Sequence, residues 1–350
     1  MNAASTTSET FHFTSAGVRC AATHVAPAGA TGASEGPGGR RVLRPVVVLA
    51  HGLAGTQDAG MMPFAEAFAA AGLHAVTFDY RGFGASEGSP RQSVSLAGQI
   101  ADLHAVIEAA KRRDGVDPEQ VVLWGISLGG GHVVSVAAER DDVAAVISAV
   151  PLVDGLAAAA LAAREHTPAQ LLASTGRGVL SAVRRRAGRG PAMIPVVARP
   201  GEVGALTQPG ALEDYLAIAG PTWRNEVAAD VVMELGTRAP AKAAHSLRVP
   251  WLVQVADFDR SAPPHAAMKA AGAGRAEVRH YPGGHFDLFA GKPCHERAVA
   301  HAVLFLRRHL DVPAPVEPGE PAEVAEVAEV AEGSGPAGAT GPEQVGYATR

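Results

Sequence analysis

The chain has 350 residues, of which 47% are hydrophobic and 19% charged, and its formal net charge is −5. This length allows one large α/β domain or two small domains with a sizeable core. The negative charge gives no electrostatic reason to expect nucleic-acid binding. Cys20 and Cys294 lie far apart in sequence and form no metal-binding or redox motif. We therefore expect two free thiols, no metal site and a cytoplasmic protein.

The N-terminal segment does not have the pattern of a secretory signal. Residues 1–9 lack a basic start followed by an apolar stretch, and we expect them to be flexible. The apolar run at 156–163 is too short to cross a bilayer. We accordingly expect no contact with a membrane.

The next segments predict a sheet in which strands and helices alternate. Residues 10–15 and 18–25 are typical of a two-stranded hairpin, and the Gly-rich residues 27–39 of a flexible surface loop. The continuous apolar run at 45–50 predicts a buried strand. Further strands are expected at 73–78, 121–124, 143–149, 250–255 and 276–281, and helices at 59–71, 93–112, 130–139, 264–271 and 294–309. This order predicts an α/β fold with a mostly parallel sheet and helices on both faces.

A long segment interrupts this alternation, and we expect a helical lid at about 155–245, inserted into an α/β domain that spans 10–310. The segment contains alanine-rich, helix-like pieces. An apolar lid of this kind would also allow a homo-oligomer to form through it. Its basic cluster is interpreted as the solvated face of a helix and consists of Arg184, Arg185, Arg186 and Arg189.

The last segment, 311–350, is rich in Pro, Gly, Ala, Glu and Val. Between residues 323 and 332 a glutamate recurs at every third position, interleaved with valine. A period of three drifts around a helix of 3.6 residues per turn, so no stable apolar face forms. We expect a disordered low-complexity tail.

A candidate nucleophile stands directly after the strand expected at 121–124. Ser127 occupies the centre of the pattern G-x-S-x-G, between Gly125 and Gly129. This pattern places a serine on a sharp turn between a strand and a helix, where the flanking glycines allow close approach of the backbone. Ser127 is therefore the predicted nucleophile.

A serine needs a base to accept its proton and an acid to orient that base. His285 lies in a glycine-rich loop after the strand at 276–281 and is the predicted base. Asp259, after the strand at 250–255, is the predicted acid. Asp257 and Asp154 also follow strand ends and remain as alternatives, although Asp257 fits equally well as a turn or capping residue.

An oxyanion requires backbone donors. The N–H groups of Leu128, directly after the serine, and of Leu53, in the loop after the first buried strand, are the candidates. His51 in that loop is interpreted as a structural residue that is hydrogen-bonded within the loop. Asp79 and Arg81, in a Gly-rich turn, are interpreted as structural support for the rim of the site.

These residues together resemble the α/β-hydrolase superfamily, and in particular its branch of serine-aminopeptidase-like and dipeptidyl-peptidase-like hydrolases. The resemblance rests on His51-Gly52, on the segment 79–84, on 125–129, and on Asp259 and His285. It implies an eight-stranded, mostly parallel sheet, a covalent acyl-enzyme and no cofactor. Relatives of this fold that open epoxides or remove halides carry an aspartate where this chain has a serine.

The residues and the resemblance together predict a serine hydrolase that acts on a small-molecule carboxylic ester or acyl substrate. Three alternatives remain: an acyltransferase or thioesterase, an amide-cleaving aminopeptidase for small peptides, and a non-catalytic ligand-binding protein on the same scaffold. An aminopeptidase would need a charged group to hold the peptide amine, for which the lid offers Glu165, Glu202, Glu213 and Glu234. Apolar lid residues are candidates for the pocket wall, although most are expected simply to pack the lid: Leu156, Leu161, Leu171, Trp223 and Met233.

Overall fold

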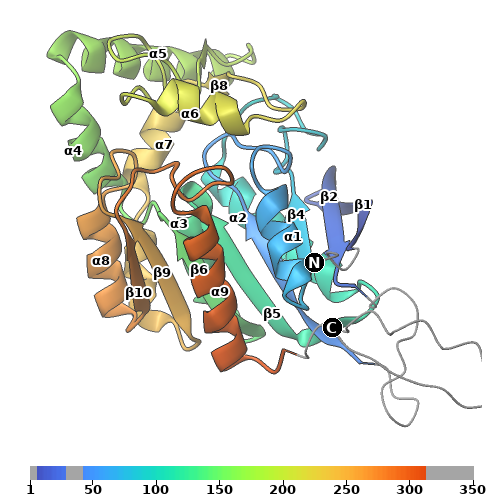
Figure 1. The fold of residues 1–350 in the computed structure, drawn as a ribbon. Helices are drawn as coiled ribbons and strands as arrows, with labels where there is room; N and C mark the ends of the chain where they lie inside the picture. Colours follow the sequence, from blue (N-terminus) through green and yellow to red (C-terminus); the bar gives the residue numbers. More distant parts are fainter. Residues whose placement is uncertain (1–5, 29–41, 313–350) are drawn as a thin grey trace, which may run out of the picture. The chain divides into compact units, whose positions relative to one another are not determined.

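A computed structural model describes residues 6–28 and 42–312. An eight-stranded sheet runs through it in the order β1-β2-β4-β3-β5-β6-β9-β10 (Figure 1). The antiparallel pairs β1–β2 and β2–β4 lie at one side of the sheet, and all other neighbours are parallel. The strands are β1 (Thr7–Ser15), β2 (Val18–Ala26), β3 (Arg44–Ala50), β4 (His74–Phe78), β5 (Val116–Ile126), β6 (Val143–Ala149), β9 (Trp251–Ala256) and β10 (Glu277–Tyr281). This arrangement confirms the predicted mostly parallel α/β sheet.

Helices cover both faces of the sheet (Figure 1). On one face α1 and α9 pack against each other, and on the other α2 packs against α3 while α8 lies along β9. Because both faces are covered, every residue of β3, β4 and β9 is buried. This burial explains their continuous apolar sequences. The helices are α1 (Met62–Ala70), α2 (Leu96–Lys111), α3 (Leu128–Ala137), α8 (Pro264–Ala273) and α9 (His295–His309).

Several element boundaries differ from those expected from the sequence. Strand β5 begins at Val116, five residues before the apolar run, because Arg44 of β3 pairs with Val116. Helix α2 begins at Leu96, where the Ser95 side chain caps it by accepting a hydrogen bond from the Gly98 N–H at 3.2 Å. Helix α3 begins at Leu128, two residues earlier than predicted. The earlier start of α3 makes Ser127 the residue that joins strand to helix.

The segment between β6 and β9 forms a separate layer of mainly helical structure, here called the insertion (residues 155–246). It lies over the edge of the sheet at which the parallel strands end (Figure 1). Its helices are therefore close to the loops that follow β3, β5, β9 and β10. Its elements are α4 (Gly155–Glu165), α5 (Pro168–Arg186), β7 (Met193–Ile194), α6 (Ala211–Ile218), β8 (Val227–Ala228), α7 (Val231–Thr237) and the 3₁₀ turns η1 (Pro240–Lys242) and η2 (Ala244–Ser246).

Three further sequence expectations concern the ends of the chain, the thiols and the membrane. Most of the predicted loop at 27–39 and nearly all of the predicted tail at 311–350 lie outside the described residues. Cys20 and Cys294 are buried free thiols, as expected. None of the helices in the described ranges is long and apolar enough to span a bilayer.

Candidate active site

Ser127 occupies a strained turn between β5 and α3. Its φ and ψ angles are +57° and −119°, a conformation that non-glycine residues rarely adopt and that costs about 1–3 kcal/mol. The two glycines of the motif make this turn sterically possible. A Cβ at Gly125 would lie 2.3 Å from the carbonyl oxygen of Gly129, and one at Gly129 would lie 2.2 Å from that of Ala50. The motif is therefore required by backbone packing as well as by the position of the serine.

A continuous hydrogen-bond chain links Ser127 to a histidine and a carboxylate. The Ser127 Oγ lies 2.9 Å from His285 Nε2, and His285 Nδ1 lies 2.7 Å from Asp259 Oδ2. Because a carboxylate only accepts, Nδ1 carries the proton and Nε2 is free to accept the serine proton. The His285 and Asp259 side chains are buried, with 7% and 2% exposed. The arrangement can deprotonate Ser127 as its oxygen attacks a carbonyl.

Asp259 is held in place by the start of its own loop. Its Oδ1 accepts hydrogen bonds from the N–H groups of Ser261 at 2.7 Å and Ala262 at 2.8 Å, which leaves Oδ2 for His285. The two alternative acids have other partners. Asp257 bonds to His280 at 2.6 Å, and Asp154 caps α4 by accepting from the Ala157 N–H at 3.0 Å. Of the three candidates, the structure brings Asp259 to the histidine.

Two backbone N–H groups beside Ser127 are free to receive an oxyanion. Leu128 is the first residue of α3, and Leu53 lies in the loop after β3; both line the cavity described below. Neither N–H donates to an acceptor within the described ranges of the chain. The carbonyl of Leu53 accepts a hydrogen bond from the Tyr215 hydroxyl of α6 at 3.0 Å. A residue of the insertion thus helps to fix the loop that carries one of these donors.

The remaining polar residues of these loops have structural partners. His51 Nδ1 lies 3.1 Å from the Gly52 carbonyl oxygen, which confirms the expected hydrogen bond within the loop, and burial lowers the pKa of His51 to about 4. Asp79 accepts from the Gln57 N–H at 2.7 Å and the Ala85 N–H at 2.9 Å, and burial raises its pKa. Arg81 donates to Asp102 at 2.8 Å. Asp79 and Arg81 therefore brace loops behind the site and do not line its cavity.

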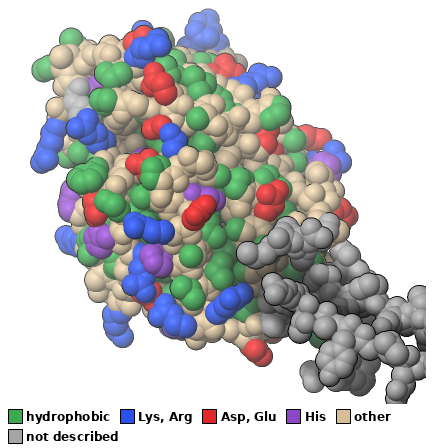
Figure 2. All heavy atoms as spheres, viewed as in Figure 1, with side chains coloured by type: hydrophobic (Ala, Val, Ile, Leu, Met, Phe, Trp, Pro, Cys, Tyr) green, Lys and Arg blue, Asp and Glu red, His purple; other side chains and the backbone are tan. Residues whose placement is uncertain are grey.

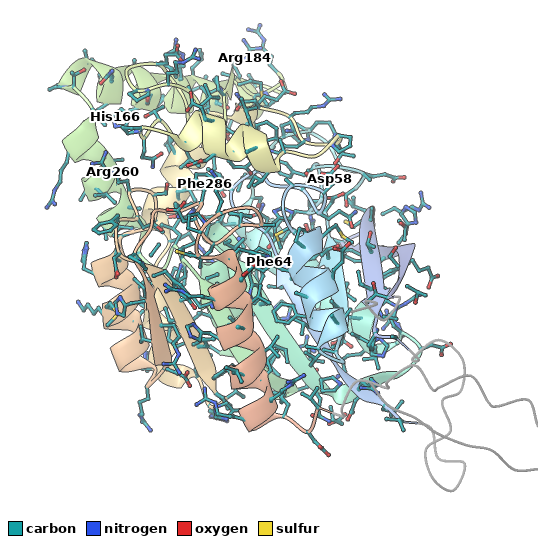
Figure 3. All side chains as sticks on the ribbon, viewed as in Figure 1. Asp58, Phe64, His166, Arg184, Arg260 and Phe286 are labelled. Carbon is teal, nitrogen blue, oxygen red and sulfur yellow. The ribbon has the colours of Figure 1, made fainter. Side chains whose placement is uncertain are left out.

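A cavity of about 450 Å³ opens above Ser127, between the sheet and the insertion. Figure 3 shows His166 at the junction of α4 and α5, and Arg260 and Phe286 among the loops that follow β9 and β10. The lining is mostly apolar. Its insertion side includes Ala158, Ala159, Ala162, Leu171, Met233 and Leu235, and its other side includes Leu53, Met61, Ile126, Leu152, Phe286 and Phe289. Such a cavity can hold an apolar group of a substrate next to the serine.

The structure selects among the wall residues suggested by the sequence. Leu171 and Met233 line the cavity, whereas Leu156, Leu161 and Trp223 do not. Leu156 is 73% exposed, and Trp223 stacks on Tyr215 with ring centres 4.8 Å apart. The sequence analysis missed the alanines of α4 and the pair Phe286 and Phe289. The three-residue spacing of those aromatics directly after His285 was the signal that could have revealed them.

The glutamates suggested as anchors for a peptide amine lie elsewhere. Glu234 accepts a hydrogen bond from the Leu96 N–H at 2.9 Å, and Glu202 accepts from the Arg199 N–H at 2.9 Å. Glu213 is exposed in the first turn of α6. These three do not line the cavity. The side chain of Glu165 lies outside the described residues.

Comparison with known proteins places this site in a family. The family model described as "Serine aminopeptidase, S33" matches residues 42–291, a range that contains Ser127, Asp259 and His285. The quorum-quenching protein AidA of Acinetobacter baumannii (strain MDR-ZJ06) is 36% identical over 274 residues, which is 77% of this chain and 88% of that protein.

Two further comparisons extend the picture. The thiohydrolase aneE of Aspergillus aculeatus is 34% identical over 110 residues, which is 31% of this chain and 35% of that protein. The crystal structure of the α/β hydrolase GrgF from Penicillium sp. sh18 superposes with a TM-score of 0.70 at 21% identity and covers 87% of this chain and 99% of that one. This likeness shows a shared fold.

Proposed function

Because the chain belongs to the serine aminopeptidase S33 family, within the α/β-hydrolase superfamily, we propose that it is a serine hydrolase that cleaves carboxylic esters through an acyl-enzyme. The observation that carries this proposal is the hydrogen-bond chain from Ser127 through His285 to Asp259 at the floor of an apolar cavity. The insertion acts as a lid over that cavity.

In the first half of the reaction, Ser127 Oγ attacks the carbonyl carbon of the ester and gives its proton to His285 Nε2. Asp259 stabilises the imidazolium that forms and keeps the ring oriented. The negative charge that develops on the carbonyl oxygen is held by the N–H groups of Leu53 and Leu128. Collapse of this intermediate expels the alcohol, which takes the proton from His285, and leaves the acyl group on Ser127.

In the second half, His285 removes a proton from water, and the resulting hydroxide attacks the acyl-enzyme carbonyl. The same two N–H groups hold the second oxyanion. His285 then returns the proton to Ser127 Oγ as the carboxylic acid leaves. The chemistry uses water and groups of this chain.

The surroundings of the serine favour esters with an apolar acyl or alcohol group over peptides. The cavity wall is largely aliphatic and aromatic. None of Glu202, Glu213 and Glu234 reaches the cavity to hold a peptide amine. Since one relative is named for quorum quenching, signal molecules that carry a hydrolysable carbonyl belong in the substrate panel.

The proposal is tested with nitrophenyl esters whose acyl chains run from acetate to decanoate. We expect turnover by the native protein, with an optimum chain length set by the cavity. Ser127→Ala should lower kcat roughly 10⁴-fold or more, whereas Ser135→Ala in α3 serves as a matched control and should leave it unchanged. Equal turnover by Ser127→Ala and the native protein would contradict the assignment.

A second candidate function is acyl transfer or thioester cleavage on the same residues. It is favoured by the segment shared with a protein named as a thiohydrolase. Nitrophenyl esters and matched acyl thioesters are compared with water alone and with added alcohols or thiols. Ester hydrolysis with no transfer product supports the first function. Preference for thioesters, or an acyl product on the added acceptor, supports the second.

A further inference from the structure

Helix α5 (Pro168–Arg186) has two different faces. Its inner face contains residues that are buried or that line the cavity: Leu171, Ser174, Thr175, Gly178 and Ser181. Its outer face consists of apolar residues that are exposed by 75%, 47%, 51% and 55%, respectively: Leu172, Val179, Leu180 and Val183. A surface helix normally directs its large apolar residues inward, so this outer face is unusual and indicates a binding surface.

The outer apolar residues form a continuous stripe with arginines beside it. At 100° per residue, the four apolar side chains fall within a sector of about 100°. Arg177 and Arg184 lie beyond one edge of that stripe and Arg186 beyond the other, and all three are exposed. Figure 3 shows Arg184 on the side of the insertion that faces away from the sheet, and Figure 2 shows hydrophobic and basic side chains next to each other in that region.

The charge around this stripe has one sign. Residues 166–201 contain six arginines and no Asp or Glu, although the whole chain carries a net charge of −5. Of these arginines, Arg185 pairs with Asp230 of the insertion at 2.7 Å and lies toward the inner face. The outer stripe thus combines exposed apolar side chains with an acid-free basic border.

We propose that the outer face of α5 docks on the surface of an anionic phospholipid bilayer. A helix lying in the plane of a bilayer buries an apolar face at the acyl boundary, and its arginines extend to the headgroups. Anionic headgroups complement Arg177, Arg184 and Arg186. A second copy of the chain fits less well, because two-fold pairing of this face would bring arginines together with no acid to balance them.

This surface changes two expectations from the sequence, which indicated no membrane contact and a solvated basic face. It also connects docking to the site, because the opposite face of α5 lines the cavity. An apolar ester dissolved in the bilayer would then be near the insertion. That consequence rests on the proposed function, whereas docking itself does not depend on catalysis.

The test is co-sedimentation of the full chain with phosphatidylcholine vesicles and with vesicles that also contain phosphatidylglycerol. We expect binding to the mixed vesicles, weaker binding to phosphatidylcholine alone, and release from the mixed vesicles as salt is raised. Absence of binding to the mixed vesicles, or equal binding to both kinds, would overturn the proposal.

Variants connect the binding to α5. Leu172→Gln with Leu180→Gln should abolish sedimentation, and removal of each arginine in Arg177→Gln/Arg186→Gln should weaken partitioning roughly fivefold. A matched change on α9, Leu304→Gln with Arg307→Gln, replaces one exposed apolar and one basic residue outside the insertion and should bind like the native chain.

Two readouts keep the result independent of folding and of the proposed function. Circular dichroism and urea unfolding should be unchanged in the α5 variants, since the substituted side chains are exposed. Docking is measured without substrate, so an inactive Ser127→Ala protein should still bind vesicles. Unchanged binding of the folded α5 variants would overturn the proposal. Sedimentation-velocity data that show self-association through α5, with no vesicle binding, would assign the face to a second copy instead.

Discussion

The hydroxyl of Tyr215 donates a hydrogen bond to the carbonyl oxygen of Leu53 at 3.0 Å. Tyr215 belongs to α6 of the insertion, and Leu53 belongs to the loop that supplies a proposed oxyanion donor. The tyrosine ring also packs against Phe286, the residue after His285, with ring centres 5.7 Å apart. A single side chain of the insertion therefore contacts both loops that flank Ser127.

Removal of that hydroxyl should affect the transition state more than substrate binding. Tyr215→Phe keeps the ring and its stacking on Trp223 but loses a hydrogen bond whose net contribution is about 0.5–1.5 kcal/mol. We expect kcat to fall roughly 3- to 10-fold with little change in KM, and the affinity for a boronic acid inhibitor to fall in parallel. An unchanged boronate affinity would show that the tyrosine only packs the insertion.

The acid of the hydrogen-bond chain can be tested with a matched pair of variants. Asp259→Asn removes the charge that faces His285, and we expect kcat to fall by roughly 10³- to 10⁴-fold. Asp257→Asn, two residues away on an exposed pair with His280, should leave kcat close to that of the native protein. A larger loss in Asp257→Asn than in Asp259→Asn would transfer the role to the other acid.

The elbow glycines should be intolerant of any side chain. Gly129→Ala would place a Cβ 2.2 Å from the Ala50 carbonyl oxygen, so the backbone must move, and we expect a loss of about 3 kcal/mol or more in the free energy of unfolding. Gly176→Ala is the control, because it lies inside α5 with no atom within 4 Å of the added carbon. It should stabilise the protein by up to about 1 kcal/mol. Urea unfolding measures both, and equal stabilities would contradict the close approach.

Buried histidines should make the protein less stable in mild acid. Burial lowers the pKa of His24, His51 and His74 to about 4 and that of His132 to about 3. A histidine in the unfolded chain titrates near 6.5, so the unfolded state binds more protons below that pH. The stability is therefore full above about pH 6.5 and is lost as the pH falls toward 4, by about 1.4 kcal/mol per pH unit for each histidine.

A variant tests this pH dependence. His132→Gln should unfold more easily at neutral pH, because it loses the bond to Gln99, but its stability should fall less steeply with acid than that of the native protein. His280→Gln, on an exposed side chain, should keep the native slope. Identical slopes in all three proteins, measured by urea unfolding across this range, would contradict the assignment of the buried histidines.

The central fold and the three residues of the hydrogen-bond chain were accessible from the sequence for a physical reason. In a parallel sheet the carboxyl ends of the strands meet at one edge, so polar residues that directly follow strands converge there. Ser127, Asp259 and His285 each follow a strand by a few residues, and the structure brings them into contact. The glycines around Ser127 gave a local signal because their close approaches are made within the same turn.

The remainder depended on packing between segments that are distant in sequence. Tyr215 meets Leu53 across 162 residues, and no local pattern marks that pair. Helix α4 is alanine-rich on every side, so its composition did not show which alanines line the cavity. The basic residues of α5 were correctly expected to be exposed, but the apolar stripe beside them became visible only once the inner face was known.

Covalent labelling of the serine tests the central claim most directly. The native protein is treated with an alkyl fluorophosphonate, and the modified residue is located by peptide mass spectrometry. We predict one stoichiometric adduct on Ser127, loss of esterase activity in step with labelling, and greatly slowed labelling in His285→Ala. A chain that hydrolyses esters while Ser127 stays unlabelled, or that is labelled equally fast in His285→Ala, would contradict the account.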